Sequence, residues 1–323
     1  MYIAAEGATF SLLKQEFPGL QFLPLAGYRV KYSRKKNFLP LIILIQVPKI
    51  IFTIYKEHQW LKKTIKKYKV DIVISDNRFG LYNKKAYCIY ITHQLLIRTG
   101  NVITEKIAQR IHYRFIKKYD QCWVPDFEKE GLAGELSHPA LLPGNIKYIG
   151  MLSRFELLGN IQKKYDLLIS ISGPEPQRKI FEDQVIRDLG SFSGTALFIR
   201  GMPESSELLQ VSNPGIEIKN HLAARELNVA ILQSDIVISR CGYTTVMDLV
   251  KLKKKAILIP TPGQTEQEYL AKYLMGKKIF YTVDQENFSL HDSLEQAAEF
   301  PFAMTGYDME DYKKAISELV RSA

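Results

Sequence analysis

Residues 235–248 have the sequence DIVISRCGYTTVMD, an apolar run followed by a small-residue turn and a helical pattern. Such an order predicts a buried strand that leads directly into a helix. The N–H groups and the dipole at the start of that helix favour a phosphate, and Gly242 permits close approach of a ligand. Thr244 or Thr245 supplies a hydroxyl, and Asp248 lies where a carboxylate can take both hydroxyls of a ribose. The alternative is a plain N-capped helix with Asp248 exposed.

A second polar segment follows the next predicted strand. Residues 260–268 have the sequence PTPGQTEQE and come directly after the apolar residues 256–259. Loops at the carboxyl ends of strands bind the ligand in open α/β sheets, so Gln264, Gln267 and Glu268 are candidate sugar contacts. The other interpretation is a surface loop before a capped helix, because Thr265 with Glu268 also fits a capping box.

A third segment follows the first predicted strand of the same half of the chain. Residues 170–178 have the sequence SISGPEPQR, in which Ser172, Gly173 and Arg178 are candidate contacts for a pyrophosphate. Three loops at the carboxyl ends of three strands in one sheet are a stronger signal than any single motif.

Short apolar runs alternate with longer helical patterns along the chain, which is typical of βαβ units and a parallel sheet. The length of 323 residues suits two domains of about 150 residues each. We therefore predict an α/β fold of two Rossmann-like domains, residues 1–150 and 151–323, facing each other across a cleft. Residues 150–162 are the predicted linker. The predicted strands are 2–5, 21–24, 71–75, 87–92, 121–124, 146–149, 167–170, 195–199, 216–218, 236–239 and 256–259, and the predicted helices include 9–16, 48–68, 104–118, 244–251, 267–274 and 309–320.

Composition narrows the class of protein without naming a function. Hydrophobic residues make up 46% and charged residues 24% of the chain, which excludes a disordered, collagen-like or disulfide-rich protein. The cysteines Cys88, Cys122 and Cys241 lack the spacing of a metal site or redox pair, so a reducing compartment is expected. The first residues do not have the pattern of a secretory signal, and we expect a cytoplasmic protein.

The positive charge lies in the first half of the chain. Residues 1–149 hold 24 Lys+Arg against 11 Asp+Glu, which gives them a net charge of +13, whereas the whole chain has +10. Much of it, in 34–36 and in the lysine run 62–69, brackets the apolar stretch 38–55. That stretch is too interrupted to span a bilayer, but its neighbourhood suits peripheral contact with anionic lipid. A solvated helix face is the alternative for the lysine run, and no nucleic-acid-binding motif is present.

From about Asp166 to Leu274 the sequence resembles the C-terminal donor-binding domain of glycosyltransferase family 28, which contains the peptidoglycan N-acetylglucosaminyltransferases. The resemblance is carried by residues 238–248, 256–260 and 267–269. It implies the GT-B fold, a UDP-sugar substrate and no cofactor. It also implies that Asp248 binds the ribose and that Thr245 meets the pyrophosphate. Further donor contacts implied are His221 and Leu222 at the uracil, Gln267 and Glu268 at the sugar, and Arg240, Gly242 and Thr244 in the shared segment.

The sequence departs from the family pattern in both halves. Asp248 stands where the family has a glutamate, and Gln267-Glu268 stand where it usually has two glutamines, so N-acetylglucosamine does not follow as the donor sugar. The first strand and Gly-rich loop of the N-terminal domain have no counterpart before Met1. A misassigned start, a truncated gene and a degenerate protein are the three explanations.

Asp76 and His93 follow two predicted strands of the first half and are the candidate general bases. For His93 the alternative is a histidine that caps a strand end and bonds to the backbone. No Asp-x-Asp metal motif is present, and no metal ligand is predicted.

The predicted function is inverting, metal-independent transfer of a sugar from a UDP-sugar, with UDP-N-acetylglucosamine as one option. The predicted acceptor is a hydroxyl of a lipid-linked or cell-envelope glycan. A nucleotide-sugar hydrolase on the same fold and a non-catalytic nucleotide-sugar-binding protein are the alternatives.

Overall fold

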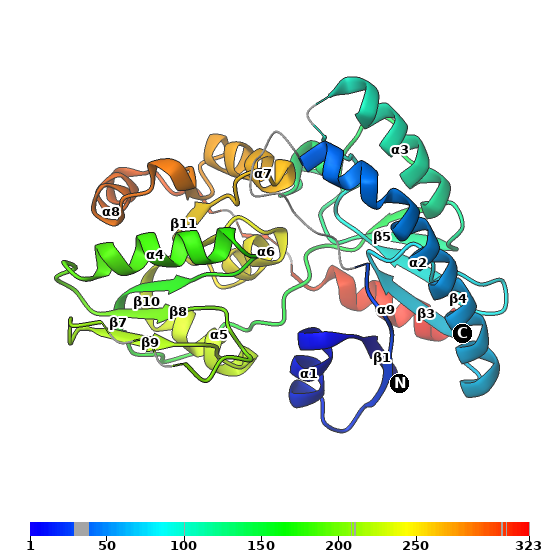
Figure 1. The fold of residues 1–323 in the computed structure, drawn as a ribbon, viewed down its shortest axis with the longest axis horizontal. Coiled ribbons are helices and arrows are strands. Elements are labelled where there is room, and N and C mark those ends of the chain that lie inside the picture. The colour runs from blue at the N-terminus through cyan, green and yellow to red at the C-terminus, as the bar shows by residue number, and fades with distance from the viewer. Residues whose placement is uncertain are drawn as a thin grey trace. The chain divides into compact units, whose positions relative to one another are not determined.

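The computed structural model describes residues 1–28, 39–99, 101–207, 209, 211–304, 306–307 and 309–322. The chain divides into two compact units, Met1–Met151 with Asp308–Ala323, and Leu152–Tyr307. Each unit is an α/β structure with parallel strands (Figure 1), which confirms the predicted fold class.

The N-terminal unit contains two parallel sheets. Strands β1 (Tyr2–Ala5) and β2 (Gln21–Pro24) pair to form one, and α1 (Gly7–Glu16) connects them in the chain. Strands β3 (Ile72–Asp76), β4 (Tyr87–Ile91), β5 (Gln121–Val124) and β6 (Ile146–Tyr148) form the other in chain order. Its helices are α2 (Leu39–Tyr68), α3 (Val102–Ile116) and α9 (Asp311–Ser322).

Helix α2 covers the four-stranded sheet because its apolar residues recur at helical spacing. Leu61 and Ile65 are buried against Cys88 and Tyr90 of β4 and Val124 of β5. The predicted stretch 38–55 lies partly in this helix, whereas the basic residues 34–36 lie outside the described residues. Across the described part of the chain, no helix is long and apolar enough to cross a membrane.

The second unit is a doubly wound sheet of six parallel strands. The strands are β7 (Tyr165–Ser170), β8 (Ala196–Ile199), β9 (Ile216–Lys219), β10 (Ser234–Arg240), β11 (Ala256–Ile259) and β12 (Tyr281–Thr282). They lie side by side in the order β9-β8-β7-β10-β11-β12. If β7 is counted as the first strand, this is the 3-2-1-4-5-6 order of the Rossmann fold. The order reverses between β7 and β10.

Helices cover both faces of this sheet. Leu167, Ile169 and Ile238 of one face pack with Phe181 of α4 (Gln177–Leu189) and with Leu290 of α8 (Leu290–Glu299). Side chains of the other face, including Leu168 and Leu258, are also fully buried. The remaining helices of the unit are α5 (Ala224–Leu232), α6 (Tyr243–Lys251) and α7 (Thr265–Gly276), and Figure 1 shows α4 running along the sheet.

The two compact units differ from the predicted division at the end of the chain. The division at 150 and 151 lies within one residue of the boundary between Met151 and Leu152. Helix α9, which was assigned to the second domain, clusters with the N-terminal unit, where Lys147 of β6 forms an ion pair with Glu318.

Candidate functional site

The order of the strands brings two of the predicted loops together. Strands β7 and β10 are paired in parallel, with Ser170 opposite Ser239, so residues 170–178 and 239–248 leave the sheet at the same edge. Strand β11 pairs on the other side of β10, with Ile259 opposite Arg240, and adds residues 260–268. Ligands of doubly wound sheets bind at the carboxyl edge where the strand order reverses, and this edge is therefore the candidate site.

Helix α6 begins at this edge without a side-chain cap. Its N-cap residue is Gly242, which has no side chain to accept from the N–H groups of the first turn. A Cβ atom at Gly242 would lie 4.0 Å from the Thr245 hydroxyl oxygen, and Thr244 is exposed. The helix start thus has backbone donors and hydroxyl groups of the kind that an anion accepts from, and the role of Thr244 and Thr245 in binding stays a prediction.

Arg240, the last residue of β10, is a buried cation with unused hydrogen-bond donors. The residue is 1% exposed, and its guanidinium lies 4.5 Å from the centre of the Phe181 ring. Its Nη2 donates to the carbonyl oxygen of Gln177 at 2.9 Å, whereas Nε and Nη1 have no partner among the described residues. Burial lowers the pKa of Arg240 to about 10. A cation held this way, next to an uncapped helix start, suits an anionic ligand.

Arg178 belongs to a buried ion cluster on α4 and β8. Its Nε donates to Glu175 at 2.6 Å, and its Nη1 lies 3.4 Å from Glu182, which is fully buried. Arg200, directly after β8, donates to the same Glu182 at 2.5 Å. Glu182 pairs with Arg178 of the same helix, four residues earlier. It also pairs with Arg200, which follows a strand, and so links α4 to the sheet. Arg178 thus already has two carboxylate partners, unlike Arg240.

Asp248 is buried in α6, which excludes the alternative of an exposed residue. It is 7% exposed, and its Oδ1 accepts a hydrogen bond of 2.6 Å from the Ser153 hydroxyl. Burial raises the pKa of Asp248 to about 6, while the Ser153 bond and the charge of Arg154 act in the opposite direction. A carboxylate one turn into the helix, with its second oxygen unbonded to the described residues, can accept from a hydroxyl of a ligand.

At Gly173 a ligand can come close to the backbone, and the hydroxyl of Thr261 lies beside this position. Gly173 has a φ of +112°, which favours glycine, and follows Ser172, which is exposed. A Cβ atom at Gly173 would lie 3.8 Å from the Thr261 hydroxyl. That hydroxyl is buried and has no hydrogen-bond partner among the described residues. Thr261 was not predicted as a contact, and its only sequence signal is its position two residues after β11.

The side chains predicted to hold the sugar bond to their own loop. The N–H of Thr261 donates to Gln267 Oε1 at 2.9 Å, and the Gln267 amide donates to Gln264 Oε1 at 2.6 Å. The N–H of Gly263 donates to Glu268 at 3.0 Å. The N-cap of α7 is Gln264 rather than Thr265, so Glu268 anchors the loop in another way than the predicted capping box. These bonds fix the shape of the loop at the carboxyl end of β11.

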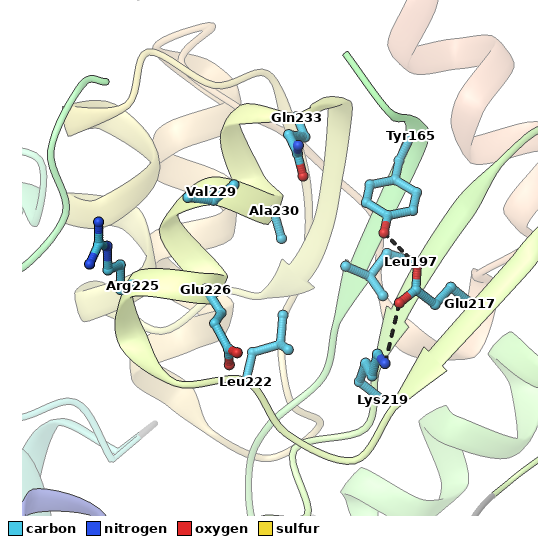
Figure 2. A pocket seen from close by; sticks show the side chains of 10 residues that line it. All are labelled: Tyr165, Leu197, Glu217, Lys219, Leu222, Arg225, Glu226, Val229, Ala230 and Gln233. Carbon is cyan, nitrogen blue, oxygen red and sulfur yellow. Dashed lines mark hydrogen bonds and ion pairs between the residues drawn. The ribbon is translucent and has the colours of Figure 1, made fainter. Parts of the chain in front are cut away.

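The predicted uracil loop borders a separate surface pocket. Leu222 lines a pocket of about 330 Å³ between α5 and strands β7 to β9, whereas His221 does not (Figure 2). Tyr165 and Lys219, which line it, both contact the Glu217 carboxylate, at 2.6 and 3.4 Å. The pocket reaches the first residue of β7, at the opposite end of that strand from residues 170–178. It therefore lies away from the edge where residues 170–178 and 239–248 leave the sheet.

In the N-terminal unit the structure brings Asp76 and His93 close enough to interact. Asp76 ends β3 and is paired in register with Ile91 of β4, two residues before His93. Loss of hydration raises the pKa of the Asp76 carboxyl, and the charge of His93 lowers it. Arg78 of the same loop forms an ion pair with the buried Glu57 of α2. The pair Asp76 and His93 has the chemistry of a general base, and its catalytic role stays a prediction.

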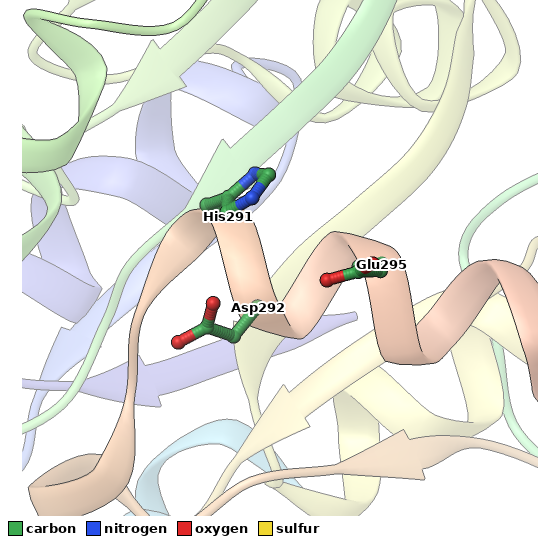
Figure 3. A group of neighbouring side chains, drawn as sticks. All are labelled: His291, Asp292 and Glu295. Carbon is green, nitrogen blue, oxygen red and sulfur yellow. The ribbon is translucent and has the colours of Figure 1, made fainter.

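One group of described residues could hold a metal ion. His291, Asp292 and Glu295 of α8 present ligand atoms within 4.8 Å of one another (Figure 3). All three side chains are exposed, and none belongs to the loops after β7, β10 and β11. The sequence pattern did not single out this group, although Glu295 lies four residues after His291 and three after Asp292, spacings that bring side chains together on a helix.

Comparison with known proteins adds a match to one domain and a fold. Residues 204–317 match the glycosyltransferase family 28 C-terminal domain. No curated protein sequence matches the chain significantly.

Solved structures match almost the whole chain at low sequence identity. The glycosyltransferase of kitacinnamycin is 13% identical with a TM-score of 0.62, over 99% of this chain and 86% of that one. The glycosyltransferase SnogD from Streptomyces nogalater is 9% identical with a TM-score of 0.57, over 100% and 91%. The UDP-GlcNAc 2-epimerase from Neisseria meningitidis, solved with UDP-GlcNAc bound, is 10% identical with a TM-score of 0.53, over 99% and 98%. At these identities the likeness is one of fold. The chain therefore has the GT-B fold of glycosyltransferases, and its residues 204–317 match the family 28 C-terminal domain of that enzyme class.

Proposed function

We propose that this protein transfers a sugar from a UDP-sugar to an acceptor hydroxyl, with the nucleotide held in the second unit. The observation that carries the proposal is Arg240, a buried guanidinium with two unused nitrogens at the edge where the strand order reverses. The start of α6 lies directly after it. A diphosphate supplies the negative charge and the acceptor oxygens that both groups lack.

The same groups would promote departure of the diphosphate. As the bond between the sugar and the diphosphate breaks, negative charge grows on the leaving oxygen. In this proposal the Arg240 guanidinium and the N–H groups of α6 would stabilise that charge, and no metal ion is required. The acceptor oxygen attacks from the opposite face of the sugar, so direct displacement inverts the anomeric carbon. Asp248 would bind the ribose, and the loop shaped by Gln267 and Glu268 would contact the sugar.

The proposed base for the acceptor is the pair Asp76 and His93. The raised pKa of Asp76 favours proton uptake closer to neutral pH than an ordinary carboxyl allows. His93 acts on the same carboxyl through its charge.

The proposed acceptor is a lipid-linked or cell-envelope glycan, because α3 presents an apolar and basic face. Ile103, Ile107 and Ile111 recur every four residues and are 69%, 56% and 48% exposed. The exposed Lys106, Arg110, Arg114 and Lys117 lie among them on the same part of the chain. Isoleucines that enter the headgroup region beside cations that pair with anionic lipid are typical of a helix that lies on a membrane surface.

Calorimetric titration tests the donor site. Wild-type protein should bind UDP and UDP-N-acetylglucosamine but not CMP, and Asp248→Ala should weaken UDP binding by about 10-fold or more. Asp292→Ala, an exposed carboxylate of the same unit, is the matched control and should leave affinity unchanged. Absence of any nucleotide binding by the wild type would refute the proposed function.

Product analysis separates transfer from the alternatives. Incubation with a UDP-sugar and a lipid-linked glycan should release UDP only when the acceptor is present, and the new glycosidic bond should have inverted configuration. UDP release without acceptor would favour a hydrolase, and binding without turnover would favour a non-catalytic protein. Strict dependence on Mn²⁺, or retention at the anomeric carbon, would contradict the displacement proposed here.

Vesicle sedimentation tests the α3 face. Vesicles with anionic phospholipid should bind the wild type, and Ile103→Asp with Ile107→Asp should abolish binding. Ile316→Asp, an exposed isoleucine on α9 of the same unit, is the control and should bind as the wild type does. Equal binding by all three proteins would rule out α3 as the membrane contact.

A further inference from the structure

The segment that opens the second unit is fastened to the carboxylate of Asp248. The N–H of Leu152 lies 3.4 Å from the sulfur of Met247, and the Ser153 hydroxyl donates to Asp248 Oδ1 at 2.6 Å. The hydroxyl oxygen of Ser153 also accepts from the N–H of Phe155 at 3.1 Å. The first two of these contacts hold the segment against the second turn of α6, and the third fixes the Ser153 hydroxyl within the segment.

The Ser153 hydroxyl is fixed at both ends, so it can orient the carboxylate. Its proton is committed to Asp248 and its oxygen accepts from the backbone of Phe155. Among the described residues no other group donates to the Asp248 side chain. One carboxylate oxygen is thereby held in place, and the other is left for a ligand hydroxyl.

We propose that Ser153 is a positioning residue for the nucleotide, whose hydroxyl fixes the Asp248 carboxylate to accept from the ribose. This inference rests on the proposed donor site and adds to it a residue outside the three strand-end loops. The segment at the start of the second unit thus takes part in recognition of the ribose.

The hydroxyl has a second effect, on the charge of the carboxylate. The pKa of Asp248 is raised to about 6 because the effect of burial is larger than the opposing effects of the Ser153 hydrogen bond and the Arg154 charge. Arg154 is the charged neighbour that acts on this carboxyl among the described residues. A charged acceptor binds a hydroxyl more strongly than a neutral carboxyl does, so ribose binding should depend on pH.

The test compares UDP with 2′-deoxy-UDP by calorimetry between pH 5 and 8. The two ligands share the same titrating phosphate, so the ratio of their affinities isolates the ribose 2′-hydroxyl. For the wild type the ratio should rise with pH with a midpoint near 6. Loss of one hydrogen bond to a charged group should move the midpoint of Ser153→Ala up by about one pH unit. With that shift, the preference for UDP falls about fivefold at pH 6, about twofold at pH 7 and little at pH 8.

Two further variants make the result specific. Ser153→Thr keeps the hydroxyl and should restore the wild-type midpoint, and Ser191→Ala, which removes an exposed hydroxyl of the same unit, should leave it unchanged.

Equal losses of UDP and 2′-deoxy-UDP affinity at every pH in Ser153→Ala would show a structural role and overturn the inference, as would an unmoved midpoint. Failure of the wild type to bind UDP at all would instead overturn the proposed function beneath it.

Discussion

Replacement of Arg240 by methionine should separate stability from nucleotide binding. Burial lowers the pKa of Arg240 from 12.5 to about 10, which corresponds to about 3 kcal/mol of unfavourable free energy for the charged form in the folded protein. Both pKa values lie above 7, so the full cost is present at neutral pH and is relieved only as the pH rises through 10. Methionine fills similar space without that cost.

The stabilising interactions that Arg240→Met removes are about as large in free energy as the cost of burying the charge that it relieves. The variant gives up the bond to the Gln177 carbonyl, about 1.5 to 3 kcal/mol, and the contact with the Phe181 ring, about 0.5 to 2 kcal/mol. The free energy of unfolding of Arg240→Met should therefore stay within about 2 kcal/mol of the wild type. UDP affinity should fall about 10- to 100-fold, because one or two charge-assisted bonds to the diphosphate are lost.

Urea unfolding and calorimetry on the same preparations measure the two quantities. Arg187→Met, an exposed arginine on α4, is the control and should change neither. The reasoning is refuted if Arg240→Met loses more than about 4 kcal/mol of stability while its folded fraction binds UDP as the wild type does. Arg240 would then be a structural residue, and the observation that carries the proposed function would lose its meaning.

Three other substitutions test the account of the second unit. Glu182→Gln should lower the free energy of unfolding by about 3 to 5 kcal/mol, because its two arginine partners lose their buried carboxylate, whereas the exposed Glu175→Gln should cost less than about 1 kcal/mol. Equal effects in urea titrations would contradict that difference. Asp248→Asn should raise the free energy of unfolding by up to about 3 kcal/mol at pH 7, because the pKa of this carboxyl is raised from 3.8 to about 6 in the folded protein. That cost is present in full above pH 6 and disappears as the pH falls below 3.8, so an equally large gain at pH 4 would contradict this cause. Gly201→Ala should cost about 3 kcal/mol or more, since φ is +69° and the new Cβ would lie 2.2 Å from the Ile171 carbonyl oxygen, and an unchanged melting temperature would exclude the clash.

The strands could be predicted from sequence because their signal is local. Apolar runs such as 256–259 and 121–124 match β11 and β5 residue for residue. Strand β12 was missed because two residues are too short for a periodic pattern. Helix α9 was located, but its packing against the N-terminal unit depends on contacts such as Lys147 with Glu318 that are far apart in the chain.

The loops of the site were predictable, but the state of their side chains was not. Strand-turn-helix patterns located residues 170–178, 239–248 and 260–268, and parallel pairing brings them to one edge. Arg178 and Arg240 look alike in sequence, and only the structure shows that Glu182 already pairs with the first. Ser153 gives no signal at all, because its contact with Asp248 spans 95 residues.

Hydrogen–deuterium exchange with and without UDP tests most directly where the nucleotide binds. Added UDP should slow exchange in residues 239–248 and 171–178, with little change around the pocket at α5. Slower exchange confined to residues 217–233, or to the N-terminal unit, would place the nucleotide elsewhere and contradict the central claim.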